Sequence, residues 1–362
     1  MDSQHPKRSA FSGKIGFVLS AAGASVGLGN IWRFPYLAAK YGGGIFLLIY
    51  IILAFTFGYT MIIAETALGR MTKKSPVGAY ASFGKGKGRS FGGWVNAVIP
   101  ILIVPYYSVI GGWVIRYLAS YISGHGKELA SDGYFFNFIA NGASAEICFA
   151  IFTILTLAII FAGVRNGVER VSKVMMPILV VLSVIIAVYS VTRPGALAGV
   201  KYFLVPNVSN FSWMTVVTAM GQMFYSLSIA MGILITFGSY MKKDVSIEDS
   251  TKNVELFDTA IAIMAGLMII PAVFSFSGGD PNTLQAGPAL MFITIPKVFD
   301  SMGLGTVVGI LFFTLVLFAA LTSSIALTES AVSTFEDELG WERHRSTFLI
   351  GGIMLVLGSL SA

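Results

Sequence analysis

The sequence has few charged residues, one cysteine and three histidines. Asp, Glu, Lys and Arg make up 12% of the 362 residues, whereas hydrophobic residues make up 55%, which excludes an ordinary soluble domain. The single cysteine, Cys148, excludes an internal disulfide and a cysteine-based metal site. None of the histidines lies in an apolar run, so we do not expect a buried histidine proton relay. This composition predicts an all-α polytopic membrane protein.

Long apolar runs recur along the whole chain. A bilayer core of ~30 Å needs about 20 apolar residues per helix. Eight runs of this kind lie near 15–37, 44–68, 94–122, 145–163, 174–192, 213–241, 256–277 and 304–335. A ninth opens near Phe348 and is cut off at Ala362. The first run has a Gly-rich interior and Arg33, unlike the apolar core of a cleavable signal peptide.

Lysine and arginine are distributed unevenly among the predicted loops. Seventeen of them lie in the N-terminal segment and in the loops between helices 2–3, 4–5, 6–7 and 8–9, against five in the opposite loops. By the positive-inside rule, this pattern predicts a cytoplasmic N-terminus in the cell membrane. The net charge of +6 therefore reflects membrane topology, and we expect no nucleic-acid partner.

The segment from Ala22 to Pro35 is unusual for a membrane helix. It contains three glycines within seven residues, Gly23, Gly27 and Gly29, and each costs roughly 1 kcal/mol relative to alanine inside a helix. One interpretation is a broken helix whose free backbone groups face an ion or a solute. The other is a packing face of small residues, because the first two glycines also fit the GxxxG pattern. The glycine spacing alone favours neither.

Polar residues near these glycines favour the broken helix. Asn30, Arg33 and Pro35 lie within two turns, and a helix packed only against lipid gains nothing from them. The sixth span has its own polar interruption at 222–232, five spans later. Paired interruptions in two five-helix units of opposite orientation are typical of a transporter binding site. The sequence therefore predicts one transporter domain over 1–362, an inverted five-helix repeat with broken helices 1 and 6. The first repeat covers about 15–192, and the incomplete second repeat covers about 213–362.

The motif Gly27-Leu28-Gly29-Asn30-x-Trp32-Arg33-Phe34-Pro35 resembles the helix 1 signature of the neurotransmitter:sodium symporter family, and the resemblance covers nearly the whole chain. It implies a Na⁺-coupled amino acid symporter that works by alternating access and is not an enzyme. It also implies that the chain is truncated within helix 9 and lacks helix 10. One alternative is a truncated, non-transporting amino acid binding or regulatory membrane protein. A channel would need pore-lining residues repeated around an axis.

The resemblance implies two sodium sites. Na⁺ takes mostly neutral carbonyl, hydroxyl and amide oxygens, with at most one carboxylate. One site would use the carbonyls of Gly23, Val26 and Ala319 with the hydroxyls of Thr322 and Ser323. The other would use Ser25, Asn30, Ser226 and Asp258. On helix 8 alone, hydroxyls of this kind more often bond to the preceding turn, and the broken helix 1 beside them favours the ion site.

Asp258 also bears on chloride. An ionisable residue within a span is a functional residue by default. Many family members carry Asn at this position, and members that require chloride usually carry Ser one turn later, where this chain has Ala262. We expect the carboxylate to supply the negative charge, so that chloride is not required. The alternative is that Asp258 is protonated or lies close to the cytoplasmic edge.

The predicted substrate is a neutral, hydrophobic or aromatic amino acid. Tyr107 matches the family's tyrosine that donates its hydroxyl to a substrate carboxylate. Aminergic members carry Asp where this chain has Gly27, so the substrate is expected to bring its own carboxylate. The predicted substrate-binding residues are Ser25, Leu28, Gly29, Ile103, Tyr107, Tyr225, Ser226, Ser228, Ala230, Met231, Ser323 and Leu327.

Residues at the ends of spans are predicted to form gates. Arg33 would close the outer side, although its usual acidic partner lies on helix 10. The inner gate would comprise Arg8, Phe11, Ser239, Tyr240 and Asp337. Glu65 matches an acid that the family carries on helix 2, and Glu329 on helix 8 has no assigned role. The expected partners are the amino acid and the lipid bilayer, and the sequence does not indicate an oligomeric state.

Overall fold

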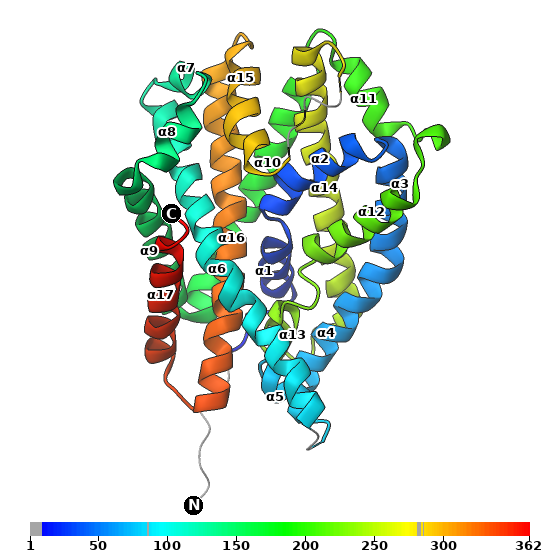
Figure 1. Ribbon diagram of the computed structural model, residues 1–362. Coiled ribbons are helices and arrows are strands. Elements are labelled where there is room, and N and C mark those ends of the chain that lie inside the picture. The colour runs from blue at the N-terminus through cyan, green and yellow to red at the C-terminus, as the bar shows by residue number, and fades with distance from the viewer. Residues whose placement is uncertain (1–8, 85–86, 281–283, 285) are drawn as a thin grey trace, which may run out of the picture.

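The computed structural model describes residues 9–84, 87–280, 284 and 286–362 (Figure 1). Every regular element in these residues is helical. The elements in chain order are α1 (Lys14–Ser25), η1 (Gly29–Arg33), α2 (Phe34–Lys40), α3 (Gly44–Leu53), η2 (Ala54–Gly58), α4 (Tyr59–Thr72), α5 (Pro76–Ala81), α6 (Lys87–Ile122), α7 (Gly126–Leu129), α8 (Tyr134–Ala140), α9 (Gly142–Phe161), η3 (Val164–Glu169), α10 (Arg170–Val191), α11 (Ala196–Leu204), η4 (Val208–Asn210), α12 (Trp213–Ser226), α13 (Ile233–Ser239), α14 (Ile247–Ser277), η6 (Leu290–Thr294), α15 (Ile295–Asp300), α16 (Gly305–Leu339) and α17 (Arg343–Ser359).

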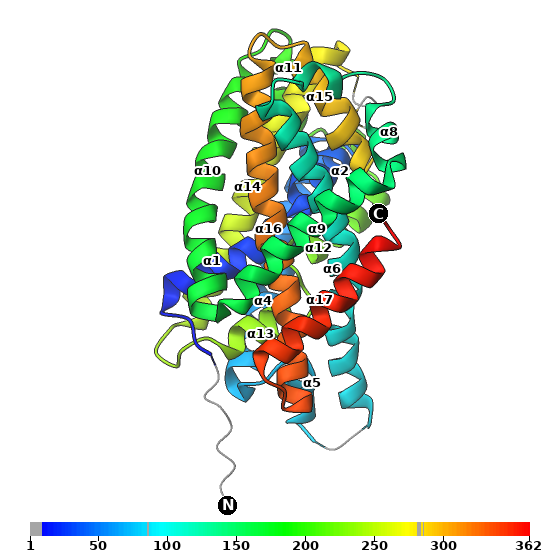
Figure 2. The same ribbon diagram turned by 90° about the vertical axis from the view of Figure 1, so that its left-hand side faces the viewer.

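The long helices form a bundle that is tall enough to cross a membrane. Among the described residues, six continuous helical segments are sufficiently long and apolar, and the bent pair of α1 with η1 and α2 makes a seventh. Two views at right angles show the long helices running between the two ends of the molecule, with α7, α11 and α15 at the end opposite the N-terminus (Figures 1 and 2). The all-α, multi-pass class is therefore confirmed.

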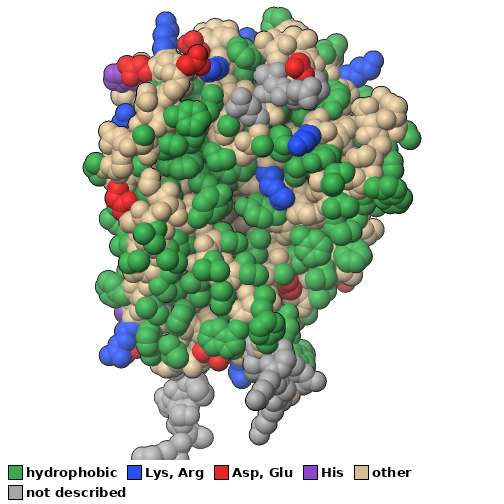
Figure 3. Space-filling model, viewed as in Figure 1, with side chains coloured by type: hydrophobic (Ala, Val, Ile, Leu, Met, Phe, Trp, Pro, Cys, Tyr) green, Lys and Arg blue, Asp and Glu red, His purple; other side chains and the backbone are tan. Residues whose placement is uncertain are grey.

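The helices differ in how far they are buried. In the apolar windows, 72% of residues are buried in Gly305–Leu339 but only 33% in Gly142–Phe161, so α16 is central and α9 is peripheral. Hydrophobic side chains cover most of the middle of the face in Figure 3, and most charged side chains lie toward its two ends. This distribution suits a molecule whose middle is surrounded by lipid.

The predicted spans match the observed helices, and four helices begin five or more residues before the predicted start. α6 begins at Lys87 and not near 94. α14 begins at Ile247 and not near 256, because Ser246 caps it by accepting a hydrogen bond from the Asp249 N–H. The fifth span begins with the π-helical turn η3, ten residues before the predicted 174. The ninth helix already begins at Arg343. Each difference is a polar extension that hydropathy does not detect.

Both predicted helix interruptions are present. The first span is bent by 53° between α1 and the segment that begins at Gly29, and Val26 in the break is extended, with φ −76° and ψ 98°. The sixth span separates into α12 and α13. Between them, Ser228 and Ala230 have φ of 54° and 61°, a left-handed conformation that costs energy for residues other than glycine. The division into two inverted repeats at 15–192 and 213–362 stays a prediction.

The second half of the broken helix 6 packs directly against α4. A β-carbon on Gly69 of α4 would lie 1.8 Å from the carbonyl oxygen of Ile235, and one on Gly238 of α13 would lie 2.3 Å from that of Thr66. The two helices therefore touch backbone to backbone, which only glycine allows. This contact fixes the position of α13 below the helix break.

We predict that Gly238→Ala destabilises the protein, because the new methyl group overpacks this contact at a cost on the order of 1–3 kcal/mol. Gly352→Ala is the matched control, since no atom lies within 4 Å of a β-carbon there. Thermal unfolding in detergent micelles should show a lower Tm for Gly238→Ala than for Gly352→Ala. Equal melting temperatures would show that the close approach of α4 and α13 is not required.

Candidate functional site

A cavity lies where the two helix breaks meet α6 and α16. It encloses about 390 Å³ of space, its open mouth included. Its lining residues are Ala24, Ser25, Gly27, Gly29, Asn30, Ile103, Tyr107, Tyr225, Ser226, Ser228, Met231, Ile233, Ser323 and Leu327. Ten of the twelve predicted substrate-binding residues are in this lining. The sequence pattern therefore predicts most of the residues that line the cavity.

The other two predicted residues lie outside the lining. The Leu28 side chain is buried in the core, and only its backbone N–H reaches a cavity residue, donating to the Tyr107 hydroxyl over 3.1 Å. Ala230 is exposed, and its N–H donates to Glu65 Oε1 over 2.8 Å. Ile233 lines the cavity instead. In an unwound segment the direction of a side chain does not follow helical spacing, which explains the difference.

Gly27 brings three elements close together. A β-carbon at this position would lie 2.6 Å from Ser323 Oγ and 2.8 Å from the Tyr107 hydroxyl oxygen. A larger residue here would therefore have to displace the Ser323 or Tyr107 side chain. The polar groups that converge here are the Tyr107 hydroxyl, the Ser323 hydroxyl and the Leu28 N–H, which donates to the Tyr107 oxygen. These hydrogen-bond donors suit an anionic group.

Asp258 is the centre of a buried polar cluster beside the cavity. Its carboxylate, fully buried, accepts hydrogen bonds from Asn30 Nδ2 at 2.9 Å, from Ser226 Oγ at 2.9 and 3.0 Å, and from the Tyr50 hydroxyl at 3.2 Å. Asn30 Oδ1 accepts from the Gly27 N–H at 3.2 Å. Asp258 therefore lies at the level of the helix breaks and not at the end of α14. Sequence reasoning did not include Tyr50, whose only signal was a tyrosine in an apolar run.

Carbonyl oxygens of helix 1 converge on a hydroxyl of α16. Ser323 Oγ lies 3.3 Å from the carbonyl oxygens of Gly23, Ala24 and Val26. Thr322 Oγ1 instead donates within its own helix, to Phe318 O at 2.9 Å and Ala319 O at 3.2 Å. Gly23 is nevertheless close, since a β-carbon there would lie 3.1 Å from Thr322 Cβ.

These oxygens are neutral and belong to carbonyl and hydroxyl groups, which is the donor set that Na⁺ takes. The residues of the first predicted sodium site are thus brought together. Of the second, Asn30, Ser226 and Asp258 are hydrogen-bonded to one another, and Ser25 lies in the same cavity wall as Asn30 and Ser226. The Ala24 carbonyl lies beside the first set of oxygens, although the sequence did not indicate it. It also accepts a hydrogen bond from Ser228 Oγ at 3.2 Å.

Arg33 lies beside the outer wall of the cavity. Its guanidinium donates to Gln222 Oε1 over 3.2 Å and lies 5.0 Å from the centroid of the Tyr225 ring. Gln222 in turn donates to the Gly29 carbonyl over 3.1 Å. A neutral amide and an aromatic ring therefore receive the cation, and both also contact the helix 1 break or the cavity.

At the opposite end, Phe11 closes the space under α1. It is 1% exposed, its ring makes edge-to-face contacts with Phe17, Phe237 and Tyr240, and its N–H donates to Tyr240 O over 3.1 Å. Ser239 bonds within α13, through Oγ to the Thr236 carbonyl at 2.5 Å.

Asp337, the acid predicted for the inner gate, lies near the start of α5. Its Oδ2 accepts from the Ser75 N–H at 2.5 Å. Arg8 falls outside the described residues, so its pairing with Asp337 stays a prediction.

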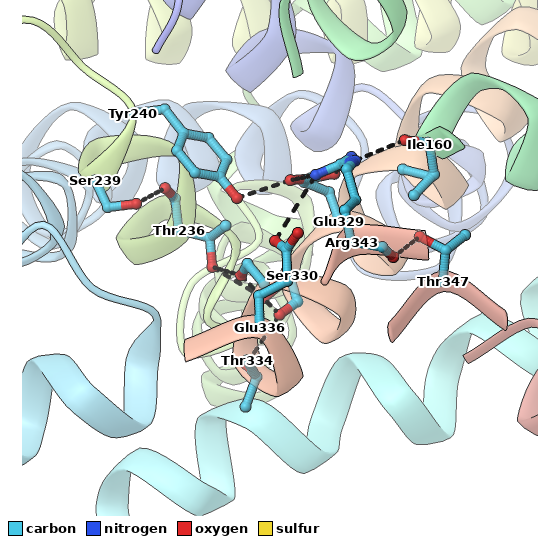
Figure 4. A network of polar contacts seen from close by, with 11 residues as sticks. Ile160, Thr236, Ser239, Tyr240, Glu329, Ser330, Thr334, Glu336, Arg343 and Thr347 are labelled. Carbon is cyan, nitrogen blue, oxygen red and sulfur yellow. Dashed lines mark hydrogen bonds and ion pairs between the residues drawn. The ribbon is translucent and has the colours of Figure 1, made fainter. Parts of the chain in front are cut away.

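Glu329 has the role that the sequence left open (Figure 4). Fully buried on α16, it accepts the Tyr240 hydroxyl at 2.7 Å and pairs with both terminal nitrogens of Arg343, at 2.5 and 3.1 Å. Arg343 also donates to the Ile160 carbonyl at 2.9 Å and lies 3.8 Å from Glu336. The network joins α9, α16, α17 and the end of helix 6 near the inner gate.

The chain is similar to known sodium-dependent transporters. The model of the sodium:neurotransmitter symporter family matches residues 8–127 and 138–361. The uncharacterized sodium-dependent transporter YhdH of Bacillus subtilis is 36% identical over 97% of this chain and 79% of its own length. The uncharacterized sodium-dependent transporter MJ1319 of Methanocaldococcus jannaschii is 31% identical over 98% and 75%, respectively.

A solved structure is similar over nearly the whole chain. The crystal structure of MhsT in complex with L-phenylalanine superposes with a TM-score of 0.88 at 38% identity, over 98% of this chain and 80% of that one. The fold built from α1 to α17 is therefore that of MhsT, whose structure holds L-phenylalanine.

We predict that Glu329→Gln destabilises the protein by up to about 3–5 kcal/mol, because the largely buried Arg343 guanidinium loses its nearest counter-charge and keeps only the more distant Glu336. The double variant Glu329→Gln/Arg343→Met should recover part of the loss. Glu342→Gln is the matched control, because Glu342 directly precedes Arg343 and is exposed. Thermal unfolding of the four proteins measures the effect. If Glu329→Gln has the same Tm as wild type, the Glu329–Arg343 pair does not stabilise the protein.

Proposed function

This chain belongs to the sodium:neurotransmitter symporter family, and we propose that it carries a neutral amino acid with a hydrophobic or aromatic side chain into the cell together with Na⁺. As a member of that family it is a multi-pass, sodium-coupled transporter and not an enzyme. The observation that carries the proposal is the cavity at the two helix breaks, where anion-binding donors and sodium-type oxygens lie side by side.

The substrate's carboxylate would sit against the helix 1 break. Tyr107 would donate its hydroxyl there, the Leu28 N–H that now bonds to Tyr107 lies beside it, and the residue at this point of helix 1 is Gly27, which brings no acidic side chain. A substrate that brings its own carboxylate therefore complements the site. The Ser228 hydroxyl and the carbonyls of the two breaks are acceptors suited to the substrate's ammonium group.

The substrate's side chain would occupy the apolar part of the cavity. Ile103, Met231, Ile233 and Leu327 form this part of the wall, and no charged side chain lines it. The thioether of Met231 adapts to different shapes, so aliphatic and aromatic side chains both fit the chemistry. The bound L-phenylalanine in MhsT supports an aromatic substrate among them.

Two Na⁺ ions are the expected co-substrates. One would lie among Ser25, Asn30, Ser226 and Asp258, close enough to the cavity for the substrate carboxylate to complete its ligands. The other would lie among Gly23, Val26, Ala319, Thr322 and Ser323. In both cases helix 1 supplies carbonyls and other helices supply side chains, α12 and α14 for the first ion and α16 for the second, so binding of an ion would fix helix 1 relative to them.

Alternating access would open the cavity to one side at a time. Arg33 with Gln222 and Tyr225 would act on the outer side, and Arg8, Phe11, Ser239, Tyr240 and Asp337 on the inner side. The positive-inside rule assigns the end with the N-terminus to the cytoplasm and the protein to the cell membrane. Binding of an amino acid without transport is the alternative function, and uptake by proteoliposomes distinguishes the two.

We predict that Thr322→Val/Ser323→Ala requires about tenfold more Na⁺ for half-maximal substrate binding, because two hydroxyl ligands are lost at about 1 kcal/mol or more in total. Thr314→Val is the matched control, since its hydroxyl also bonds within α16, to Ile310 O, away from helix 1. Equilibrium binding of L-phenylalanine at graded Na⁺ concentrations makes the measurement. An unchanged Na⁺ dependence in the double variant would show that the ion site is elsewhere.

We also predict that transport does not require chloride. Tyr50, Ser226 and Asn30 already donate to the Asp258 carboxylate, which supports an internal anion in place of chloride. Replacing chloride by gluconate should leave wild-type uptake unchanged. Asp258→Asn should lower uptake, and Asp258→Asn/Ala262→Ser should restore it only when chloride is present. A wild-type protein that needs chloride would contradict the assignment.

The third prediction tests the substrate class. Decarboxylated analogues leave two buried donors unpaired at about 1–3 kcal/mol each, a factor of roughly 30 to 20,000 in affinity. In proteoliposomes with an inward Na⁺ gradient, L-phenylalanine, L-leucine, L-tyrosine and L-tryptophan should compete for uptake, whereas tyramine and tryptamine should not.

Tyr107→Phe should reduce the difference in affinity between the amino acids and their amines, because it weakens the binding of the amino acids. If tyramine competed as well as tyrosine, the amino acid assignment would be wrong. Sodium-dependent binding without uptake would instead favour the non-transporting alternative.

A further inference from the structure

A second groove lies on the outside of the bundle, at the end that carries the N-terminus. It runs between the last turns of α4 and the start of α14, which pack against each other, and it holds about 910 Å³ of space, open at its mouth. Ala64, Ala67, Leu68 and Met71 of α4 form one wall. These residues lie on the face of α4 opposite to the buried Glu65, Thr66 and Gly69, so the groove faces the surroundings of the bundle and not its core.

The walls of this groove are apolar and narrow. Two of the α4 residues are alanines one turn apart, which leaves a furrow between bulkier neighbours. Met71 is 66% exposed and Ile247 of α14 lines the other side. From Ala64 to Met71 the helix rises about 10 Å, a length that matches a stretch of a lipid acyl chain.

Two cations line the same groove at its polar end. The Arg70 guanidinium donates to the carbonyl oxygens of Lys243, at 3.0 Å, and of Val245, which holds it in place. Lys243 is exposed, and its ammonium group makes no hydrogen bond or ion pair within the part of the chain that the structure describes. Its neighbour Lys242 differs, because its ammonium donates to Ser12 O at 2.8 Å.

The acidic residues of this region do not line the groove. Asp244, Glu248 and Asp249 follow Lys243 in the loop and in the first turn of α14, but the only charged residues in the lining are Arg70 and Lys243. A pair of cations in the wall of an apolar furrow, at the end of a membrane helix, is complementary to a molecule with an anionic head and an apolar tail.

We propose that this groove binds an anionic phospholipid, with its phosphate against Arg70 and Lys243 and an acyl chain along the alanines of α4. Basic residues at the membrane surface each contribute about fivefold to the binding of an anionic lipid. The positive-inside rule assigns this end to the cytoplasmic leaflet. The site is separate from the substrate cavity, and the proposal does not depend on which amino acid is transported.

Native mass spectrometry tests the proposal. The full chain in detergent is offered equal amounts of phosphatidylglycerol and phosphatidylcholine with identical acyl chains, and the ratio of retained lipids is measured. Wild type should retain phosphatidylglycerol in preference. Lys243→Gln should lower that preference about fivefold, and Ala67→Trp should reduce it by filling the furrow. Lys201→Gln, an exposed lysine on α11 at the opposite end, is the matched control and should behave as wild type.

Three results would overturn the proposal. Equal retention of the two lipids by wild type would show that the cations do not select a headgroup. An unchanged preference in Lys243→Gln would place the selective site elsewhere. Abolition of the preference by millimolar inorganic phosphate, with no effect of Ala67→Trp, would identify a free-phosphate site. Because Arg70 also supports the loop between α13 and α14, Lys243 is the residue on which the test depends.

Discussion

The interruption of helix 1 is the feature on which the rest of the structure depends. Free backbone groups at membrane depth must be satisfied by protein, and here α6, α12 and α16 each provide a contact, while Asp258 of α14 bonds to the Asn30 side chain. Tyr107 receives the Leu28 N–H, Asn30 receives the Gly27 N–H, and Ser323 reaches the carbonyls between Gly23 and Val26. The cavity, the proposed carboxylate site and the two proposed sodium sites all depend on keeping this one break stable.

The contacts that stabilise the break are the same ones that a substrate and its ions would use. Tyr107 already accepts a hydrogen bond, and the Asp258 carboxylate is already surrounded by three donors. Binding would therefore exchange internal partners for external ones, which limits the net affinity and keeps the site ready to empty. The opposite arrangement holds near the inner gate, where Glu329 and Arg343 satisfy each other, and this pair gives that end a fixed connection among four elements.

The sequence predicted the features that depend on residues close together in the chain. Apolar runs marked the spans, the glycines around Gly27 marked the first break, and ten of the twelve proposed substrate residues line one cavity. It failed where a partner lies across space or where the backbone leaves regular structure. The pairing of Glu329 with Arg343 depends on a turn between two helices, and Ala230 turns away from the cavity because residues with positive φ do not follow helical spacing. The early start of α14 depends on a cap and not on hydropathy.

The central claim is that sodium and an amino acid bind next to each other at the break in helix 1. Reciprocal linkage tests it most directly: the affinity for L-phenylalanine is measured at several Na⁺ concentrations, and the affinity for Na⁺ at several L-phenylalanine concentrations. If the two share ligands around Asn30 and Asp258, each must raise the affinity for the other by the same factor. Binding of L-phenylalanine that is equally tight when Na⁺ is replaced by K⁺ would contradict the account.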